Sequence, residues 1–317
     1  MSEFWQPTAN LSSLQARDKL YKKIRSFFSE KKYLEVDVPL LGSGGTTDRF
    51  IQSFYTYSGS QRFYLQTSPE FAMKRLLVSG AGPIYTLTKA FRQEEIGCYH
   101  NSEFTMLEWY RPDFDDHQLM AEVSELMSYF FDYDIEKKSY QEIFQTHLSI
   151  CPYSDSLERI KSVALSTLDI AGLENEKDKD VWLDVLFSHV IQPKLKDKLF
   201  FIYDYPQTQS ALARVEKNSA GVFVARRFEL FVDGVELANG YWELTDSNEQ
   251  RARFDKDNEQ RKFSDLPVVN HDAHLIKAME KGLPDCAGVA LGVDRLLMLI
   301  EGAEDIAEVV AFPFGRA

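Results

Sequence analysis

The fold is decided by residues 91–110, FRQEEIGCYHNSEFTMLEWY. Side chains alternate over 91–94 and again over 103–110, which predicts two strands whose neighbouring side chains point to opposite faces. Between them, 95–102 is a polar run with glycine and asparagine, residues that favour turns. The stretch therefore predicts an antiparallel hairpin with charged residues on both arms.

The charged residues of this hairpin indicate its chemistry. Arg92 and Glu94 lie two apart on one strand and would share a face. A guanidinium binds a phosphate or carboxylate through two parallel hydrogen bonds. An isolated Arg-x-Glu also fits an ion pair on a solvated sheet edge, so the residues that follow decide between the two. Those residues are His100, Asn101, Glu103, Phe104, Thr105, Met106, Glu108 and Tyr110.

This pattern resembles motif 2 of class II aminoacyl-tRNA synthetases, specifically the lysyl branch. A predicted helix at Leu14–Lys32, capped by Ser12 or Ser13 and followed by a predicted strand at Tyr33–Leu41, resembles motif 1, the dimer interface of that family. The apolar stripe of this segment is expected to need a partner surface. Gly292-Val-Asp-Arg295 before an apolar helix resembles motif 3. The resemblance covers Leu14 to Ala317 and implies an α+β fold, a mainly antiparallel sheet flanked by helices.

A second hairpin is predicted over 225–239, because Asp233-Gly234 is a strong two-residue turn signal. Glu229 and Glu236 lie one on each arm. Carboxylate oxygens are the ligands that Mg²⁺ prefers, although two glutamates near a turn also fit a solvated sheet face. The family resemblance implies that Glu229 and Glu236 carry Mg²⁺ ions bridging the phosphates of ATP.

The resemblance also implies the roles of single residues. Arg92 and Arg295 would be the catalytic side chains, binding the α- and γ-phosphates of ATP by position and charge. The other ATP-binding residues would be Glu94, His100, Asn101, Phe104, Glu236, Leu237 and Gly292. The amino-acid pocket would be formed by Ser68, Glu70, Glu108, Tyr110, Asn239, Glu243 and Ala290, the last at a point where lysyl-tRNA synthetases carry glycine.

One catalytic domain over 1–317 is expected, with a helical insertion around 140–198 that includes helices near 156–170 and 178–190. Only thirteen residues precede the first predicted helix, too few for an anticodon-binding barrel. This combination is similar to the stand-alone paralogues of lysyl-tRNA synthetase. It implies a ligase that activates (R)-β-lysine with ATP and transfers it to a lysine ε-amine of elongation factor P, as a homodimer without stable tRNA binding.

Three alternatives stay open. A truncated lysyl-tRNA synthetase acting on tRNA would share every site residue, and a non-catalytic synthetase-like regulator would share the fold. A zinc protein would use His271, His274 and Cys286, but two histidines in a polar run without a cysteine pair more often face solvent.

Composition limits the class of protein further. Acidic residues outnumber basic ones by 49 to 36, which gives a net charge of −13 and disfavours a broad nucleic-acid surface. The three cysteines are odd in number and far apart, which favours a reducing compartment over a disulfide framework. Since no apolar run is long enough to span a membrane, a cytoplasmic protein is expected.

Overall fold

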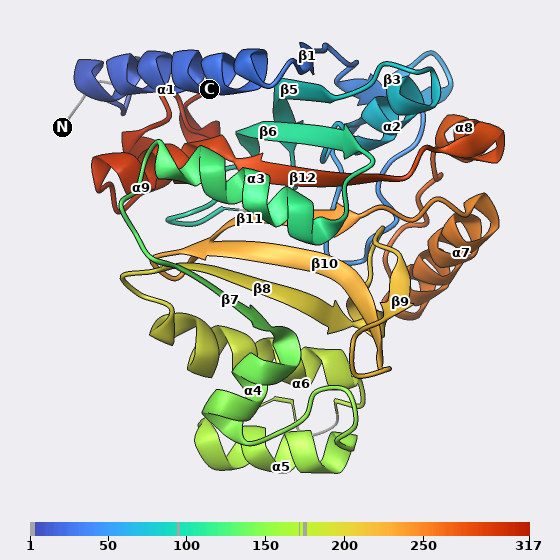
Figure 1. Cartoon of the computed structure of the whole chain (residues 1–317). Coiled ribbons are helices and arrows are strands. Elements are labelled where there is room, and N and C mark those ends of the chain that lie inside the picture. Colours follow the sequence, from blue (N-terminus) through green and yellow to red (C-terminus); the bar gives the residue numbers. More distant parts are fainter. Residues whose placement is uncertain (1–3, 94–95, 171, 174–175) are drawn as a thin grey trace. The chain divides into compact units, whose positions relative to one another are not determined.

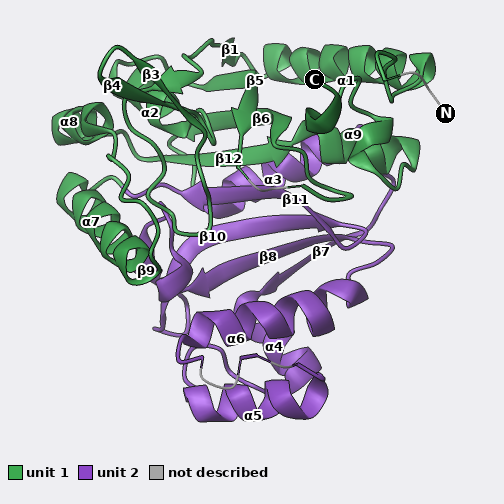
Figure 2. Ribbon diagram, turned by 180° about the vertical axis from the view of Figure 1, so that it is seen from behind, with its two compact units in different colours: residues 1–115, 245–317 green, residues 116–244 purple. Residues whose placement is uncertain are grey.

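The computed structural model describes residues 4–93, 96–170, 172–173 and 176–317 (Figure 1). The chain divides into two compact units, coloured separately in Figure 2. Unit 1 comprises Met1–Asp115 and Thr245–Ala317, and unit 2 comprises Asp116–Leu244. Both contain mainly antiparallel strands with helices beside them, so the expected α+β class is confirmed. The expected single domain with an insertion remains a prediction.

Unit 1 contains the hairpin predicted from residues 91–110, but the strand expected over 91–94 is wrong: the first arm ends at Phe91, and Gln93 forms only an isolated bridge to Gln52. Its strands lie in the order β1 (Leu34–Glu35), β5 (Ile84–Phe91), β6 (Glu103–Pro112) and β12 (Cys286–Gly292), with only β1–β5 parallel. A small sheet is formed by β2 (Leu41–Gly42), β4 (Gln61–Leu65) and β3 (Tyr55–Ser58). The helices are α1 (Leu11–Glu30), α2 (Glu70–Val78), α7 (Ser247–Phe263), α8 (Ala273–Gly282) and α9 (Val293–Glu301), with short 3₁₀ turns at Ile306–Glu308 and Phe314–Arg316.

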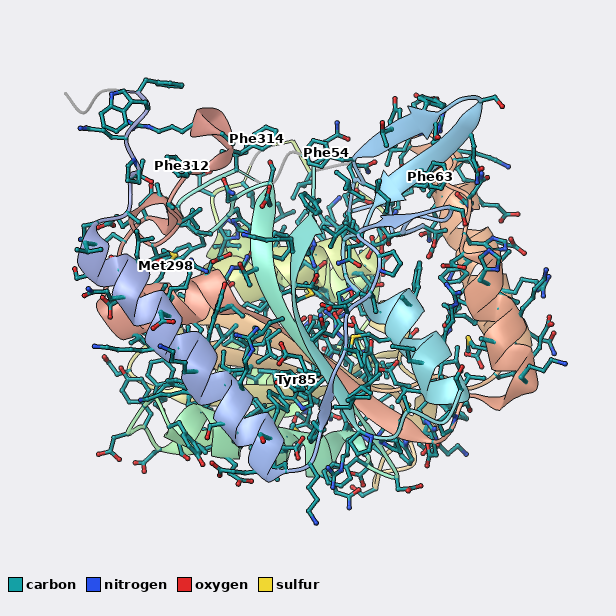
Figure 3. All side chains as sticks on the ribbon, turned by 90° about the horizontal axis from the view of Figure 1, so that it is seen from above. Phe54, Phe63, Tyr85, Met298, Phe312 and Phe314 are labelled. Carbon is teal, nitrogen blue, oxygen red and sulfur yellow. The ribbon has the colours of Figure 1, made fainter. Side chains whose placement is uncertain are left out.

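One face of this sheet is apolar and lies against α1. Phe28 of α1 stacks on Tyr85 of β5 with ring centres 4.4 Å apart, and lies 5.3 Å from the ring of Trp109 in β6. Tyr85 and Trp109 are direct cross-strand partners, so both point to this face. Figure 3 shows Tyr85 and Met298 of α9 beside α1. The burial of this face fixes the register of β5 and β6.

The opposite face of the same strands is polar. Glu108 of β6 lies between Thr86 of β5 and Ala290 of β12, so these three residues form one row across the sheet. Helix α2 packs near β6 and carries Glu70 and Lys74, both of which are buried. The alternation of strand side chains therefore separates a packing face from a face available for chemistry.

Three details of the motif 1 prediction are wrong. Helix α1 begins at Leu11, because Asn10 rather than Ser12 or Ser13 caps it, its Oδ1 accepting from Ser13 N at 2.9 Å. Most of 33–41 is irregular: β1 pairs with β5 over two residues, and Val36 N donates to Tyr85 O before the chain leaves the sheet. The apolar stripe of α1 is buried within its own chain, so it needs no partner surface.

Unit 2 contains a helical layer on one face of its strands. The strand order is β11 (Val235–Trp242), β10 (Phe223–Val232), β8 (Leu199–Pro206) and β7 (Ile135–Ser139), with β9 (Val215–Lys217) also paired to β10. The helices are α3 (Asp116–Ser128), α4 (Tyr140–Leu148), α5 (Leu157–Thr167) and α6 (Lys179–Leu186), followed by π and 3₁₀ turns at Phe187–Ile191, Gln192–Lys194 and Gln207–Gln209. Helices α5 and α6 confirm the two predicted near 156–170 and 178–190.

The core of unit 2 joins this helical layer to the strands. Trp182 of α6 and Tyr140 of α4 are fully buried in one cluster with Phe200 of β8 and Phe231 of β10. In the part of the chain that the structure describes, no helix is long and apolar enough to cross a membrane.

Candidate active site

The polar face of unit 1 brings together four of the residues expected in the amino-acid pocket. Ser68 Oγ donates to Glu108 Oε2 at 2.7 Å, and Tyr110 OH donates to Glu108 Oε1 at 2.8 Å. The Ser68 hydroxyl also accepts from the backbone N–H of Glu70 at 3.1 Å, in the first turn of α2. The Glu108 carboxyl group is therefore held by the hydroxyl of Ser68, just before α2, and by the hydroxyl of Tyr110 in its own strand.

Sequence reasoning missed a fifth member of this group, Lys74. Its ammonium lies 2.5 Å from Glu70 Oε1, one helical turn away, and its side chain is fully buried. The i,i+4 spacing of Glu70 and Lys74 was visible in the sequence and is the usual spacing of a helical ion pair. The group thus contains two carboxyls and one ammonium.

Glu108 is the most strongly perturbed acid of this group. Its burial, together with the nearby Glu70 charge, raises the pKa of Glu108 to about 8, although Ser68, Tyr110 and Lys74 favour the ionised form. Only 2% of the residue is exposed, so desolvation of the charged form dominates. Burial therefore favours the protonated form of Glu108 in the free protein, with a hydroxyl group beside either carboxyl oxygen.

The predicted phosphate-binding residues of unit 1 lie near the 97–100 turn. The guanidinium carbon of Arg92 lies 5.2 Å from the ring centre of Phe104, a cation–π contact. Arg295 Nε donates to Tyr99 O at 3.2 Å, and Nη2 lies 2.7 Å from His100 Nε2. The structure therefore groups Arg92 with Phe104, and Arg295 with His100. Glu94 lies outside the described residues.

The C-terminal segment supports the same turn, which the sequence did not reveal. Asn101 Oδ1 accepts from Phe314 N at 2.9 Å, and Cys98 O accepts from Ile306 N at 2.8 Å. Figure 3 shows Phe314 near Phe54, and their ring centres are 5.8 Å apart. The Asn101 amide is thus occupied by backbone contacts, and its expected contact with adenine remains a prediction.

Two further candidate site residues, Ala290 and Gly292, lie in strand β12. Ala290 lies directly across from Glu108, on the polar face. Gly292 is the N-cap residue of α9, so Arg295 stands in the first turn of that helix. A helix N-terminus carries a partial positive charge, which adds to the field that Arg295 provides for an anion.

In unit 2 the candidate residues depend on a β-bulge. Phe231 pairs with Glu236, but Leu230 pairs with Ala238, so Leu237 is the extra residue. Glu229 pairs with Asn239 across β10 and β11. Because the bulge shifts the alternation by one, Glu229, Glu236 and Asn239 all point to one face. Without it, Glu236 and Asn239 would point to opposite faces.

The hairpin turn itself was predicted correctly. Asp233 and Gly234 have φ of 51° and 78°, the left-handed values that a two-residue turn of this kind requires. Glu243 follows β11, bridges to Ala213, and is 1% exposed. The structure therefore places Glu243 as a buried acid beyond the end of the strand that carries Asn239.

The carboxyl of Glu229 is held on both oxygens. Tyr205 OH donates to Oε2 at 2.8 Å, and Arg227 contacts Oε1. Burial raises the pKa of Glu229, and the neighbouring charge of Glu236 raises it further, while Arg227 and Tyr205 favour the ionised form. Two neighbouring carboxyls that repel each other, Glu229 buried and Glu236 half-buried, offer oxygen ligands that suit Mg²⁺ completed by water and phosphate oxygens.

No larger metal centre is present in the described part of the chain, where no group of three or more His, Cys, Asp and Glu could hold an ion. Cys286 is buried in β12, and His271 stacks on Phe254 with ring centres 5.7 Å apart. The zinc alternative, which used His271, His274 and Cys286, has no support from this arrangement.

Comparison with known proteins agrees with the fold. The family model described as tRNA synthetases class II (D, K and N) matches residues 6–316. The chain therefore belongs to the class II tRNA synthetase family, and the resemblance found in its sequence is confirmed. It is 46% identical over 326 residues to a protein of Photobacterium profundum, covering 100% of both chains. It is 47% identical over 322 residues to a protein of Vibrio cholerae, covering 99% of this chain and 98% of the relative. Both relatives are named elongation factor P–(R)-β-lysine ligase.

Proposed function

We propose that this chain is a ligase that activates (R)-β-lysine with ATP and transfers it to a lysine ε-amine of elongation factor P. The names of relatives that match over the full length support this function. The observation that carries it in the structure is the buried acidic pair Glu70 and Glu108, in the same unit as Arg92 and Arg295. An arriving ammonium group would share Glu70 with Lys74 and would favour the ionised form of Glu108. The arginines suit an anionic nucleotide.

The reaction proceeds in two steps, adenylation of the amino acid and transfer to the acceptor. The substrate carboxylate oxygen attacks the α-phosphorus of ATP, an O–P bond forms, and pyrophosphate leaves. The acceptor ε-amine then attacks the acyl carbon, an amide forms, AMP leaves, and the amine loses a proton to solvent. Arg92 binds the α-phosphate and the substrate carboxylate, while Arg295 binds the γ-phosphate. Their contribution is positioning and neutralisation of charge.

Glu229 and Glu236 would hold Mg²⁺, and Tyr205 and Arg227 orient the Glu229 carboxyl for that role. When bound, the ion neutralises charge on the phosphate oxygens. The remaining expected contacts follow the family resemblance: Glu94, Phe104, Leu237 and Gly292 toward the nucleotide, and Asn239 and Glu243 toward the amino acid. Glu243, almost completely buried, is suited to a side-chain ammonium.

The same proposal includes a cytoplasmic homodimer that does not bind tRNA stably. The dimer is supported by apolar side chains exposed along the motif 1 segment, with Leu34 55%, Leu40 38% and Leu41 45% exposed. Light scattering at micromolar concentration tests it. A mass of twice 36.5 kDa is expected, and a mass near 36.5 kDa would contradict it.

The decisive experiment incubates the protein with ATP, Mg²⁺, (R)-β-lysine and elongation factor P, and reads the intact mass of the acceptor. A gain of one lysyl unit is expected, and Arg92→Ala should abolish both the gain and the pyrophosphate exchange that depends on β-lysine. Charging of bulk tRNA instead would favour a truncated lysyl-tRNA synthetase. Neither reaction, with ATP still bound, would favour a regulator.

A further inference from the structure

Asp294 connects two segments of unit 1 that carry candidate nucleotide-binding residues. Its Oδ2 accepts from the backbone N–H of Thr105 at 2.6 Å. This contact lies just beyond the end of β12, whose last residue Gly292 pairs with Met106. Thr105 follows Phe104, and Asp294 precedes Arg295. The carboxyl of Asp294 therefore sets the distance between the β6 strand and the first turn of α9.

The cation beside this carboxyl comes from α1. Arg17 Nη1 lies 2.6 Å from Asp294 Oδ1, an ion pair outside hydrogen-bond geometry, with side chains 16% and 3% exposed. Arg17 Nη2 donates to Val309 O at 2.8 Å, and Nη1 donates to Tyr21 OH at 3.3 Å. One guanidinium thus touches α9, α1 and the C-terminal segment at once.

Electrostatics make this ion pair consequential. A buried carboxylate that loses its cation is far more costly than an exposed one, so the surrounding structure rearranges or the group takes up a proton. Either response changes the bond to Thr105 N. Because Arg295 is the next residue in the same helical turn, its guanidinium moves with Asp294, away from the position defined by Tyr99 and His100.

We propose that Arg17 is a positioning residue for the nucleotide half of the reaction, acting through Asp294 on Arg295 and on the backbone beside Phe104. The inference rests on the proposed function. It predicts a selective defect, because the acidic group of Ser68, Glu70 and Glu108 is held by contacts that include neither Arg17 nor Asp294. Loss of Arg17 weakens the use of ATP and leaves the amino-acid pocket intact.

The test compares Arg17→Met with Arg25→Met. Arg25 lies two turns along the same helix and pairs with Glu35 at 3.0 Å, but the two side chains are 49% and 40% exposed. In pyrophosphate exchange, Arg17→Met should raise the KM for ATP on the order of 10- to 100-fold, the scale of a small misplacement at a reacting group. The KM for β-lysine should change less than about twofold, as should both constants of Arg25→Met.

A double variant that removes both charges of the ion pair distinguishes a positioning role from a general loss of structure. Arg17→Met/Asp294→Asn removes the buried unpaired charge and keeps an acceptor for Thr105 N, so it should recover at least about tenfold of the lost ATP affinity. Equilibrium binding of ATP alone is measured in parallel. If the wild type does not bind ATP, the proposed function itself fails. If it does, equal defects for both substrates, an equal defect in Arg25→Met, or no recovery in the double variant overturns the role of Arg17. Should Arg17→Met not fold, Arg17→Gln, which also removes the cation beside Asp294 but can still donate a hydrogen bond to Val309 O, takes its place with the same expected selectivity.

Discussion

Lys74 Nζ lies 2.5 Å from Glu70 Oε1, and the lysine side chain has no exposed surface. The pair spans one turn of α2 on the polar face of unit 1. Glu70 is the acid expected to meet an amino group of the substrate, so its charge is already balanced in the free protein. An arriving ammonium therefore shares Glu70 with Lys74, and does not meet an isolated negative charge.

Replacement of Lys74 by methionine should destabilise the protein by about 3–5 kcal/mol, because it leaves Glu70 buried without its cation. The matched control is Lys22→Met in α1, whose partner Asp18 is also four residues away but whose pair is 74% and 61% exposed. That change should cost less than about 1 kcal/mol. Urea unfolding followed by circular dichroism measures both. Equal losses of unfolding free energy in the two variants would show that burial of the Lys74–Glu70 pair adds nothing to its contribution to stability.

A ligand experiment extends this prediction. Since β-lysine brings ammonium groups, it should bind Lys74→Met more tightly and, at equal ligand concentration, stabilise it against heat by more than it stabilises the wild type. The lysine ammonium and the ligand would then act on the same carboxylate. No thermal shift in the variant, alongside a clear shift in the wild type, would mean that Lys74 is needed to form the binding pocket, beyond balancing the charge of Glu70.

The pKa of Glu108 makes stability depend on pH. It is raised from 4.5 to about 8 in the folded chain, so the folded protein holds a proton that the unfolded chain has lost. This contribution to stability is complete below pH 4.5 and is lost as pH rises through 8, with a slope of at most about 1.4 kcal/mol per pH unit. Glu108→Gln should remove this slope. The difference in unfolding free energy between variant and wild type, measured by urea titration from pH 5 to 8.5, should therefore grow in favour of the variant.

Tyr205 orients Glu229 by a hydrogen bond of 2.8 Å, so Tyr205→Phe should weaken metal binding while leaving the carboxylate in place. Loss of such an orienting group typically costs 10- to 100-fold in metal affinity, and we expect about tenfold in the Mg²⁺ concentration for half-maximal pyrophosphate exchange. Water relaxation with Mn²⁺ and ATP provides a readout that does not need turnover. Tyr153→Phe is the control, because that hydroxyl donates to the Asp204 carbonyl of β8 and not to Glu229. An Mg²⁺ requirement changed equally in both variants would contradict the orienting role of Tyr205.

Local pattern was enough to predict the two hairpins, because alternation and an Asp-Gly turn act over a few residues. It was not enough for the strand expected at 33–41, where only two residues find a partner in β5. The bulge at Leu237 was also hidden, since strict alternation would have put Glu236 and Asn239 on opposite faces. Arg17 and Asp294 lie far apart in the chain, and no local signal connects residues whose contact arises from tertiary packing.

Ala290 tests how the pocket distinguishes isomers. It stands across from Glu108 on the polar face, where lysyl-tRNA synthetases carry glycine, and it is half-buried. α-Lysine and β-lysine differ by the position of one amino group. A methyl group at a close contact is typically worth about 1–3 kcal/mol, or roughly ten- to two-hundredfold in specificity. We expect Ala290→Gly to raise activation of α-lysine relative to β-lysine.

Pyrophosphate exchange with each isomer measures this ratio, and Ala287→Gly provides the matched control. Ala287 lies in the same strand and also loses one methyl, but it pairs with Arg111 and, three residues from Ala290, points to the opposite face. Both variants lose similar strand propensity, so a general loosening of β12 would shift their ratios equally. A change confined to Ala290→Gly would place the discrimination in the row that contains Glu108. An unchanged ratio in Ala290→Gly would assign the preference for β-lysine to other residues, with Glu70 and its partner Lys74 the next pair to vary.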